Sequence, residues 1–462
     1  MNNDVRAVND PSAIIVDKIE LERFDGTRKI DIKPLIVSMT LADDITSPSV
    51  YGYLVIADSN DILGKNANAL IGEEFVHVYL TQPAQSTQLP EKKLEYKFIV
   101  NTVDTEALTE QSSGSVFRIE LRSVDNLINA GAMRSKSYAN TSTNIIKTIL
   151  EKELQTERPI VNFEDTTGET SYAFTETKPF EKIAIVAAQA YNNREFVTST
   201  FTFYENFEGY NFESIENIIQ RNIETTPVKY EYKSDVSSDR DGKTSIISYI
   251  KPHRFNAALK LSYGYANTCV VSYNLVEKKP EIRNITLAKE LANSTAPRLN
   301  SIDLRGSNTF IDKVRALGNL TYLIPYAPPN AYIPERVDNT NVSLLYSSPF
   351  TVILEESTIL VRVYGTLHHD IGKLVELAFP DNMPITESQA KRIDEDLSGK
   401  YIISAVSHEI QNTGGKFEFF TNMTCVKESS LRRADYYDRL YTNSNQISIP
   451  VLQSFEATTA QE

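Results

Sequence analysis

The chain has 462 residues, of which 41% are hydrophobic and 23% are charged, and its formal net charge at pH 7 is −14. This composition is typical of soluble globular proteins, and the length predicts about three domains at roughly 150 residues each. The acidic balance argues against a protein that grips phosphate backbones, because such binding needs clustered lysine and arginine. It suits either a surface that nucleic acid passes without sticking or a surface that only keeps the chain soluble.

Targeting and redox features are few. No apolar run reaches the roughly 18 residues of a membrane span, so we expect no transmembrane helix. Residues 1–18 lack the basic start and the apolar stretch of a signal peptide. The two cysteines, Cys269 and Cys425, form neither a disulfide framework nor a zinc motif. Both lie in apolar, strand-like surroundings, and we expect them to be buried and reduced, as in the cytosol.

Six segments between residues 13 and 125 have the pattern of β-strands. They are alternating or β-branched runs separated by Asp-Gly, Pro and Ser-Gly: AIIVDKIELERF, KIDIKPLIVSMTL, YGYLVIAD, EEFVHVYLT, YKFIVNTVDTEAL and SVFRIELRSV. In the last segment Phe117, Ile119 and Leu121 fall on one face and charged residues on the other, so one face packs in the core and the other faces solvent. Six strands at this spacing predict a small antiparallel barrel or sandwich.

The pattern becomes helical after Asp125. Residues 142–155 place isoleucines and leucines at helical spacing behind a Ser/Thr cap, and residues 179–192 open with a proline in the first turn. Residues 201–212 predict a β-hairpin, and further short β-runs follow it. The proline-rich stretch 323–337 is expected to be an extended connector. β-runs return from residue 348, and residues 436–462 have no periodic pattern.

Two stretches of the chain share one order of features. IGEEFVHV (71–78) precedes FIVNTVDTE (98–106) and FRIELRS (117–123), and IGKLVELA (371–378) precedes YIISAVSHE (401–409) and FEFFTNM (417–423). Both read Ile-Gly, strand, loop, strand, turn, strand, which predicts a duplicated barrel framework. In this alignment His408 falls opposite Thr105, and Glu409 falls opposite Glu106.

The pair His408-Glu409 has the residue types of a catalytic site, but its place in the repeat favours a structural part. A catalytic histidine has no obvious reason to share its place with a threonine. The following NTGGK can reverse the chain, because Gly414 and Gly415 permit the positive φ that a tight hairpin needs. We therefore interpret His408 as a strand-end side chain near a turn, and alternation places Phe417 and Phe419 in the core.

The closing hairpin carries a family resemblance. YIISAVSHEI running into FEFFTNMT resembles the closing hairpin of the baseplate central hub protein of contractile-tailed bacteriophages. FTFYENFEGYNF (201–212) resembles the first strands of that family's second barrel, and the helices at 142–155 and 179–192 resemble its inserted domain. The resemblance runs in order over most of residues 10–430, with extra material between about 228 and 345. Similar domains form the base of type VI secretion spike proteins.

The resemblance implies a mainly β fold with an α+β insertion. Each chain would hold two similar antiparallel, tube-like β-barrels, the second interrupted by the inserted domain. The expected divisions are a first barrel at 10–125, an insert at 126–198 plus 227–345, a second barrel at 199–226 plus 346–430, and a C-terminal extension at 431–462.

The resemblance also implies a structural virion protein. This would be a homotrimeric baseplate hub that acts as a symmetry adaptor between the hexameric tail tube and the trimeric central spike, with a central channel for genome passage. The implied partners are the tail tube protein, the central spike protein and baseplate wedge proteins, with DNA only in transit and no stable membrane association. The implied location is the baseplate of the virion tail, assembled in the host cytoplasm.

Other functions stay open at this point. One is the hub of a phage-derived contractile injection device or of a secretion spike, and another is a tail-associated hydrolase of cell-wall glycan. The motifs HExxH, GxSxG, GxxxxGK[ST] and GxGxxG are absent from the sequence. In His368-His369-Asp370, adjacent side chains on a strand point to opposite faces, so we interpret this cluster as a solvated turn without a metal.

The acidic clusters also predict no site. The pairs Asp43-Asp44 and Glu73-Glu74 lie beside turns and strand starts, and we expect them to be solvated edges. The segment 230–245 contains several aspartates but lacks the register and the closing glutamate of a calcium loop. The sequence therefore predicts no catalytic residue, no cofactor and no metal.

Overall fold

The structure is a computed structural model of the chain. It describes residues 11–23, 25–26, 28–59, 62–63, 70–72, 74–84, 89–106, 115–192, 200–232, 244–252, 258, 262–263, 268–274, 278–285, 298–300, 302–303, 320–326, 351, 354–355, 357–380 and 393–430. Within these residues no helix has both the length and the apolar character needed to cross a membrane. The expected extension at 431–462 lies outside them.

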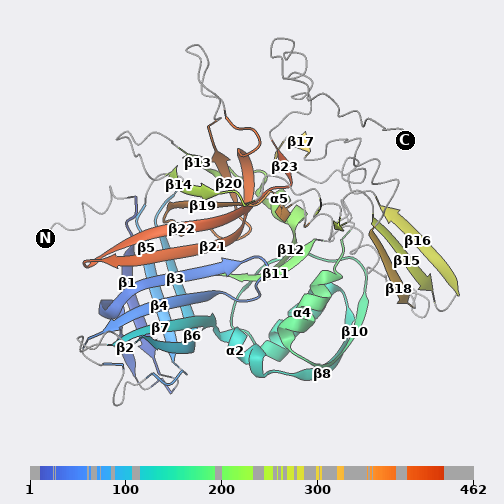
Figure 1. Ribbon diagram of the computed structural model, residues 1–462. Helices are drawn as coiled ribbons and strands as arrows, with labels where there is room; N and C mark the ends of the chain where they lie inside the picture. The colour runs from blue at the N-terminus through green and yellow to red at the C-terminus, as the bar shows by residue number, and fades with distance from the viewer. Residues whose placement is uncertain are drawn as a thin grey trace, which may run out of the picture.

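The N-terminal strands form a curved antiparallel run in the order β2-β1-β5-β6-β7-β4-β3 (Figure 1). Their bounds, with one short 3₁₀ turn, are β1 Ile15–Glu22, β2 Lys29–Asp31, η1 Lys33–Leu35, β3 Ile36–Asp44, β4 Tyr51–Asp58, β5 Phe75–Gln82, β6 Lys92–Glu106 and β7 Ser115–Ser123. Alternation builds this first barrel, because the longer strands bury roughly every second residue in one core, apart from their bulges. Phe117, Ile119 and Leu121 are buried there, as predicted.

The C-terminal strands form a closed six-stranded barrel in the order β21-β20-β13-β14-β19-β22. Its strands are β13 Val228–Tyr232, β14 Ser245–Ile250, β19 Ile359–Tyr364, β20 Leu374–Ala378, β21 Gly399–Thr413 and β22 Lys416–Val426. The pairing of β21 with β22 closes the ring. β13 is parallel to both of its neighbours, and the other ladders of this second barrel are antiparallel.

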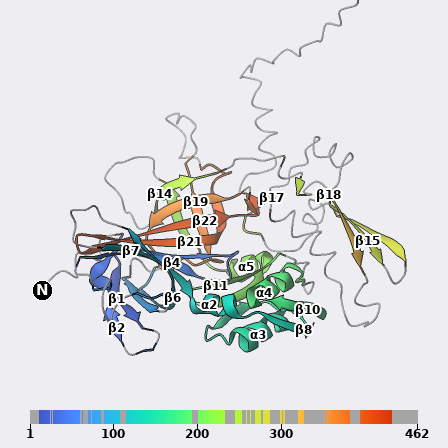
Figure 2. The same cartoon turned by 60° about the horizontal axis from the view of Figure 1, so that its bottom comes forward.

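The insert between the barrels is an α+β unit, which lies beside them in Figure 2. Its elements are α2 Val124–Gly131, β8 Arg134–Asn140, α3 Ser142–Ile149, the π-helical turn η3 Leu150–Leu154, β9 Ile160–Phe163, β10 Thr170–Thr177, α4 Pro179–Ala188, β11 Phe201–Asn206, β12 Gly209–Ser214 and α5 Ile215–Asn222. Thr141 caps α3 by accepting a hydrogen bond from the Asn144 amide, and Pro179 begins α4. Both predicted helices are present.

The chain also contains a small separate sheet and a short strand pair. β15 Thr268–Asn274 lies between β16 Lys279–Ile285 and β18 Leu320–Tyr326, and β17 Ile302–Asp303 pairs with β23 Ser429–Ser430. Residues 323–326 therefore end a strand instead of forming a connector. The rest of the proline-rich stretch lies outside the described residues.

Strand pairing differs from the expected use of residues 199–226. The hairpin β11–β12 forms as predicted, but its third strand is β9 of the insert, and its phenylalanines pack in the core of the insert. β13 and β14, which we expected in the insert, complete the second barrel instead. Alternation identifies strands but does not specify their partners, so the sequence could not distinguish these two arrangements. The mainly β fold with two barrels and an α+β insertion is confirmed.

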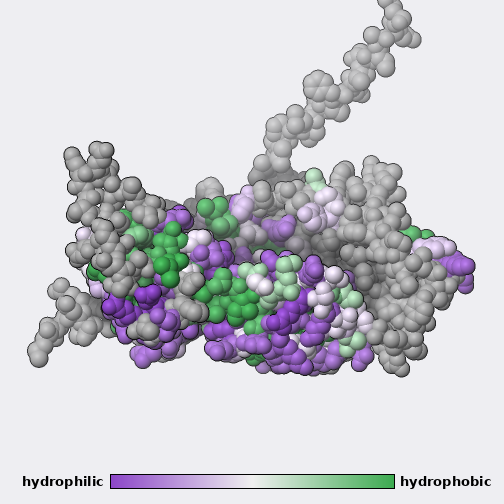
Figure 3. Space-filling model, turned by 90° about the horizontal axis from the view of Figure 1, so that it is seen from below, coloured by the Kyte–Doolittle hydropathy of each residue, from purple (hydrophilic) through white to green (hydrophobic). Residues whose placement is uncertain are grey.

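The outer surface mixes hydrophilic and apolar patches on the face drawn in Figure 3. Exposed apolar residues include Leu127 and Ile128 on α2 and Met133 just after it, with exposed fractions of 45%, 41% and 56%. Patches of this kind are common on proteins that assemble with others.

Candidate functional site

The hairpin β21–β22 belongs to both barrels. Near its base β21 pairs with β20, and nearer its tip β21 pairs with β3 of the first barrel. On the other side of the tip, Glu418 of β22 forms a bridge with Ala13, beside the start of β1. Ile410 and Phe419 therefore lie in the first core, while other inward residues of the same hairpin lie in the second. Phe417, which we expected to be buried, is only partly buried and packs against the first core. The two barrels share one continuous hydrogen-bonded sheet.

The predicted repeat corresponds to two equivalent three-stranded meanders. β5-β6-β7 and β20-β21-β22 are each antiparallel, and the middle strand has 15 residues in both. Both middle strands contain a bulge, at Asn101 between Val100 and Thr102 and at Ser404 between Ile403 and Ala405. The sequence alignment places Asn101 opposite Ser404. Because a bulge inserts one unpaired residue at a defined position, its recurrence strengthens the case for a duplicated framework.

A layer of buried polar residues separates the two apolar cores. On each of four segments, a polar residue lies two positions from a member of the first core and two positions from a member of the second. These triplets are Leu41–Asp43–Ile45, Leu367–His369–Ile371, Ile410–His408–Val406 and Phe419–Thr421–Met423. Asp43, His369, His408 and Thr421, here called the polar layer, are each at most 3% exposed.

The interpretation of His408 as a strand-end residue is wrong. His408 lies within the 15-residue strand β21 and is 1% exposed. Its Nδ1 is 3.2 Å from Oγ1 of Thr421, and its ring packs against the ring of Phe419. Burial lowers the pKa of His408 to about 4, so the imidazole is neutral at pH 7. Glu409 points the other way and forms an ion pair with Arg362 at 2.9 Å.

The segment His368-His369-Asp370 is not a solvated turn either. His369 and Asp370 are 3% and 2% exposed, and Nε2 of His369 is 2.7 Å from the hydroxyl of Tyr230. Burial lowers the pKa of His369 to about 3, which also keeps it neutral. Nε2 of the more exposed His368 is 2.7 Å from the carbonyl of Pro90. Among the described residues no group of side chains could hold a metal ion.

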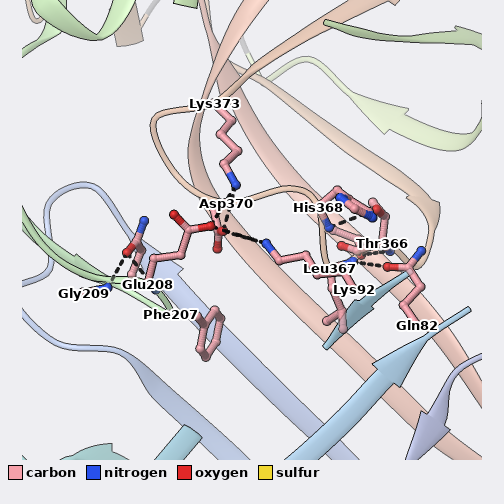
Figure 4. A network of polar contacts seen from close by, with 12 residues as sticks. Gln82, Lys92, Phe207, Glu208, Gly209, Thr366, Leu367, His368, Asp370 and Lys373 are labelled. Atoms are coloured by element: carbon pink, nitrogen blue, oxygen red, sulfur yellow. Dashed lines mark hydrogen bonds and ion pairs between the residues drawn. The ribbon is translucent and has the colours of Figure 1, made fainter. Parts of the chain in front are cut away.

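Two lysines and two carboxylates form a cluster at the rim of the polar layer (Figure 4). Nζ of Lys92 and Nζ of Lys373 lie 3.4 and 3.2 Å from Asp370, and 3.5 and 3.3 Å from Glu208. Burial alone would raise the pKa of Asp370, but Lys373 and Lys92 hold it below its ordinary value. Lys92 comes from the first barrel, Glu208 from the insert, and the other two from the second barrel, so this charge cluster connects all three parts.

The expected solvated edges are partly buried. Asp43 is 1% exposed, and neither carboxyl oxygen has a hydrogen-bond partner among the described residues. Burial, and then the charge of Asp370, raises the pKa of Asp43 well above its ordinary value. Glu74 is 3% exposed and accepts hydrogen bonds from the amides of Ile71 and Gly72. Asp44, the last residue of β3, is more exposed and accepts a hydrogen bond from the amide of Thr46. Glu73 lies outside the described residues.

Further buried charges attach the insert to the barrels. Nε of Arg158 forms an ion pair with Glu205 at 3.0 Å, and Glu205 also accepts a hydrogen bond from the hydroxyl of Tyr96 in the first barrel. Arg221 pairs with Glu213 at 2.9 Å and donates to the carbonyl of Gly372 in the second barrel. The sequence does not reveal the contacts with the barrels, because Tyr96 and Glu205 are 109 positions apart and Arg221 and Gly372 are 151 positions apart.

The site is chemically suited to holding domains together. Its histidines are neutral, and the orphan carboxyl of Asp43 has no route to solvent at 1% exposure. A glycan hydrolase needs carboxyl groups on either side of a bound sugar. No residue of the polar layer can contact a substrate in this conformation.

The two cysteines, Cys269 and Cys425, are buried, as expected.

No protein-family model and no curated protein matches the chain. Among solved structures, the tail protein from Neisseria meningitidis MC58 has a TM-score of 0.51 and 8% sequence identity, covering 90% of this chain and 97% of its own. The 43 kDa tail protein of prophage MuSo2 from Shewanella oneidensis has a TM-score of 0.50 and 9% identity, covering 89% of this chain and 98% of its own. At these identities the likeness concerns the fold. The chain therefore has the fold of these tail proteins, as the resemblance of its closing hairpin to baseplate hubs implied.

Proposed function

We propose that the chain is a structural hub of a phage tail baseplate, in which three copies form a ring. The observation that carries this proposal is the pair of equivalent meanders, which repeat strand order and bulge position within one chain. Three chains with two barrels each present six similar units, as a six-fold tail tube requires, and keep three-fold symmetry toward a trimeric spike. Such a ring uses head-to-tail contacts that close by rotation.

The proposal includes partners and location. The hub joins the tail tube protein to the central spike protein, contacts baseplate wedge proteins, and lets DNA pass through a central channel without a stable membrane contact. It is assembled in the host cytoplasm and functions in the virion tail. The tail proteins with the same fold, the acidic net charge and the exposed apolar residues on α2 support this role.

The proposed domain organisation follows strand pairing. The first barrel corresponds to the expected division at residues 10–125, completed by the tip of the β21–β22 hairpin. The α+β insert extends through α5, and the second barrel runs from β13 to β22 with an excursion that contains the β15–β16–β18 sheet. Residues 431–462 form the proposed C-terminal extension.

Native mass spectrometry of the purified chain, alone and with its spike protein, tests the ring. We expect three copies in at least one of the two samples. A single copy under both conditions would remove the basis of the proposal. Electron microscopy of the same sample should show a ring with six similar lobes around its centre.

The proposed hub has no enzymatic activity, and the glycan hydrolase is the rival. Zymography on peptidoglycan with the wild type and with His408→Ala and Asp370→Asn variants distinguishes them. We expect no clearing from any sample. Clearing by the wild type that either substitution abolishes would favour the hydrolase. The hub of an injection device or of a secretion spike has the same geometry, and neighbouring capsid and terminase genes would identify a virion.

A further inference from the structure

The correspondence between the two barrels extends beyond the two meanders. β7 pairs with β4 and β4 with β3, and β22 pairs with β19 and β19 with β14, all in antiparallel ladders. β3 has a bulge at Val37, and β14 has one at Ile247. Counted through the pairings from the bulges at Asn101 and Ser404, these two bulges occupy the same position. The runs β5-β6-β7-β4-β3 and β20-β21-β22-β19-β14 are therefore equivalent.

Within one chain, the ladder between β3 and β21 joins the two barrels. β20 pairs with residues 399–402 of β21, and β3 pairs with residues 405–411, so the second half of β21 extends past its ladder with β20. There it covers the edge of β3 that faces away from β4, with Glu409 opposite Thr40. The contact between the barrels is thus made by one overhanging strand end and one sheet edge.

The strands equivalent to β21 and β3 have the same two features without a partner strand. β5 pairs with residues 92–99 of β6, and within the described residues the rest of the strand, 101–106, pairs only with β7. β13 pairs with the first two residues of β14, and in the part of the chain that the structure describes residues 248–250 pair only with β19. Ile250 is 64% exposed, and Leu360 opposite it on β19 is 40% exposed. Each chain therefore carries one overhanging strand end on the first barrel and one open sheet edge on the second.

Open strand edges and exposed apolar side chains are both features of surfaces that pair with another chain. A second copy of this chain is the partner that fits, because the chain already pairs a strand end of this kind with an edge of this kind. We propose that the end of β6 in one copy forms an antiparallel ladder with β14 of the next copy, in the register that β21 and β3 have. This register sets Glu106 opposite Ile250, as Glu409 lies opposite Thr40.

The ladder makes all barrel contacts of the ring alike. The contact between the two barrels of one chain and the contact between barrels of neighbouring chains then use equivalent strands in the same register. Repetition of one head-to-tail contact closes a ring and leaves neither of these edges unpaired. The inference rests on the proposed ring, and it adds the strands and residues that join the copies.

Disulfide cross-linking tests the contact. A chain with E106C and I250C is assembled and then oxidised, and its products are separated on a denaturing gel without reductant. Directly opposite residues of an antiparallel pair are close enough for a disulfide. Because each bond joins two copies, we expect covalently linked dimers and trimers that reductant returns to single chains. Chains with only E106C or only I250C should stay single, and the native cysteines are buried.

Two matched pairs calibrate this result. T40C/E409C is the equivalent pair within one chain and should form an intrachain disulfide at a comparable rate. E106C/S248C moves one cysteine by two residues along β14, to a diagonal position that is generally too far away for a disulfide. It should therefore cross-link about tenfold more slowly than E106C/I250C, or slower still.

The outcomes separate the contact from the ring. A single copy by native mass spectrometry, both with and without the spike protein, overturns the ring and this inference together. Three copies without a cross-link between copies, while T40C/E409C oxidises, overturn the inference and leave the ring standing. Equal rates for E106C/I250C and E106C/S248C overturn the proposed register.

Hydrogen exchange of the wild type gives a second measurement that needs no substitution. Backbone amides of residues 101–106 and 248–250 that point to the open edges exchange slowly only where a ladder covers them. Their exchange should be about tenfold slower, or more, in the three-copy sample than in the single chain at high dilution. Unchanged exchange at both segments overturns the inference, and this measurement decides the question if the cysteine variants do not assemble.

Discussion

Gly365, which follows β19, tests the packing of the hairpin into the first barrel. A Cβ at this position would lie 2.5 Å from Cδ2 of Phe419 and still closer to other atoms of its ring, against an ordinary carbon contact of about 3.5–4.0 Å. Phe419 is fully buried and packs in the first core, so its ring has no room to withdraw. We expect Gly365→Ala to destabilise the chain by about 3 kcal/mol, the upper end of overpacking costs.

The predicted cost of Gly365→Ala comes from the contact with the Phe419 ring, so a double-mutant cycle of these two positions isolates that contact. Phe419→Ala should cost about 3–5 kcal/mol by leaving a cavity. In that background Gly365→Ala should cost less than about 1 kcal/mol, because the clashing ring is gone, giving a coupling of roughly 2 kcal/mol. Urea unfolding followed by circular dichroism measures all four chains. Additive costs in the double variant would refute the reasoning, since the glycine would then be required for another reason.

Three further predictions use the same assay. Lys182→Met should lower the free energy of unfolding by about 3–5 kcal/mol, because Glu153 then stays buried without its ion pair, which now measures 2.7 Å. The control Lys93→Met removes an exposed ion pair and should change stability very little; equal effects of the two substitutions would contradict this. Gly209→Ala should cost at least about 2 kcal/mol, since φ is +149° and a Cβ would lie 2.8 Å from Cγ2 of Val161; an unchanged midpoint would argue against it. Burial lowers the pKa of Lys427 from 10.5 to about 7. The unfolded chain therefore binds more protons between these values, and stability should rise from pH 7 to pH 9; Lys427→Met should flatten the rise, and an unchanged slope would refute this.

Local patterns in the sequence predict the elements well because their causes are local. Alternation identified the strands of the first barrel, and the cap at Thr141 and the proline at Pro179 located two helix starts. The repeat alignment also paired Asn101 with Ser404, which the structure identifies as two bulged residues. The bulge at Ser404 changes which residues of β21 point inward, so simple alternation along that strand misleads.

Alternation alone could not predict the polar layer, because the layer depends on which core each inward residue joins. His408 sits in an alternating run whose neighbours Val406 and Ile410 look equivalent in sequence, yet they lie in different cores. The expectation of a solvated Asp43 failed for the same reason. A carboxylate beside a turn is usually hydrated, but Asp43 is 1% exposed and pairs with Val406 of β21, the strand that both barrels share. The signal that could have found the layer is a polar residue inside a strongly apolar alternating run.

The shared hairpin also has a consequence for synthesis of the chain. β21 and β22 span residues 399–426. The sheet of the first barrel is therefore completed only after the ribosome has synthesised most of the chain. Domains usually fold as units while the ribosome is still adding residues, the N-terminal ones first. Here a nascent or prematurely terminated chain keeps β3 as an open edge, which is prone to pairing with other strands. A chain that ends before these two strands therefore lacks the parts that complete both barrels.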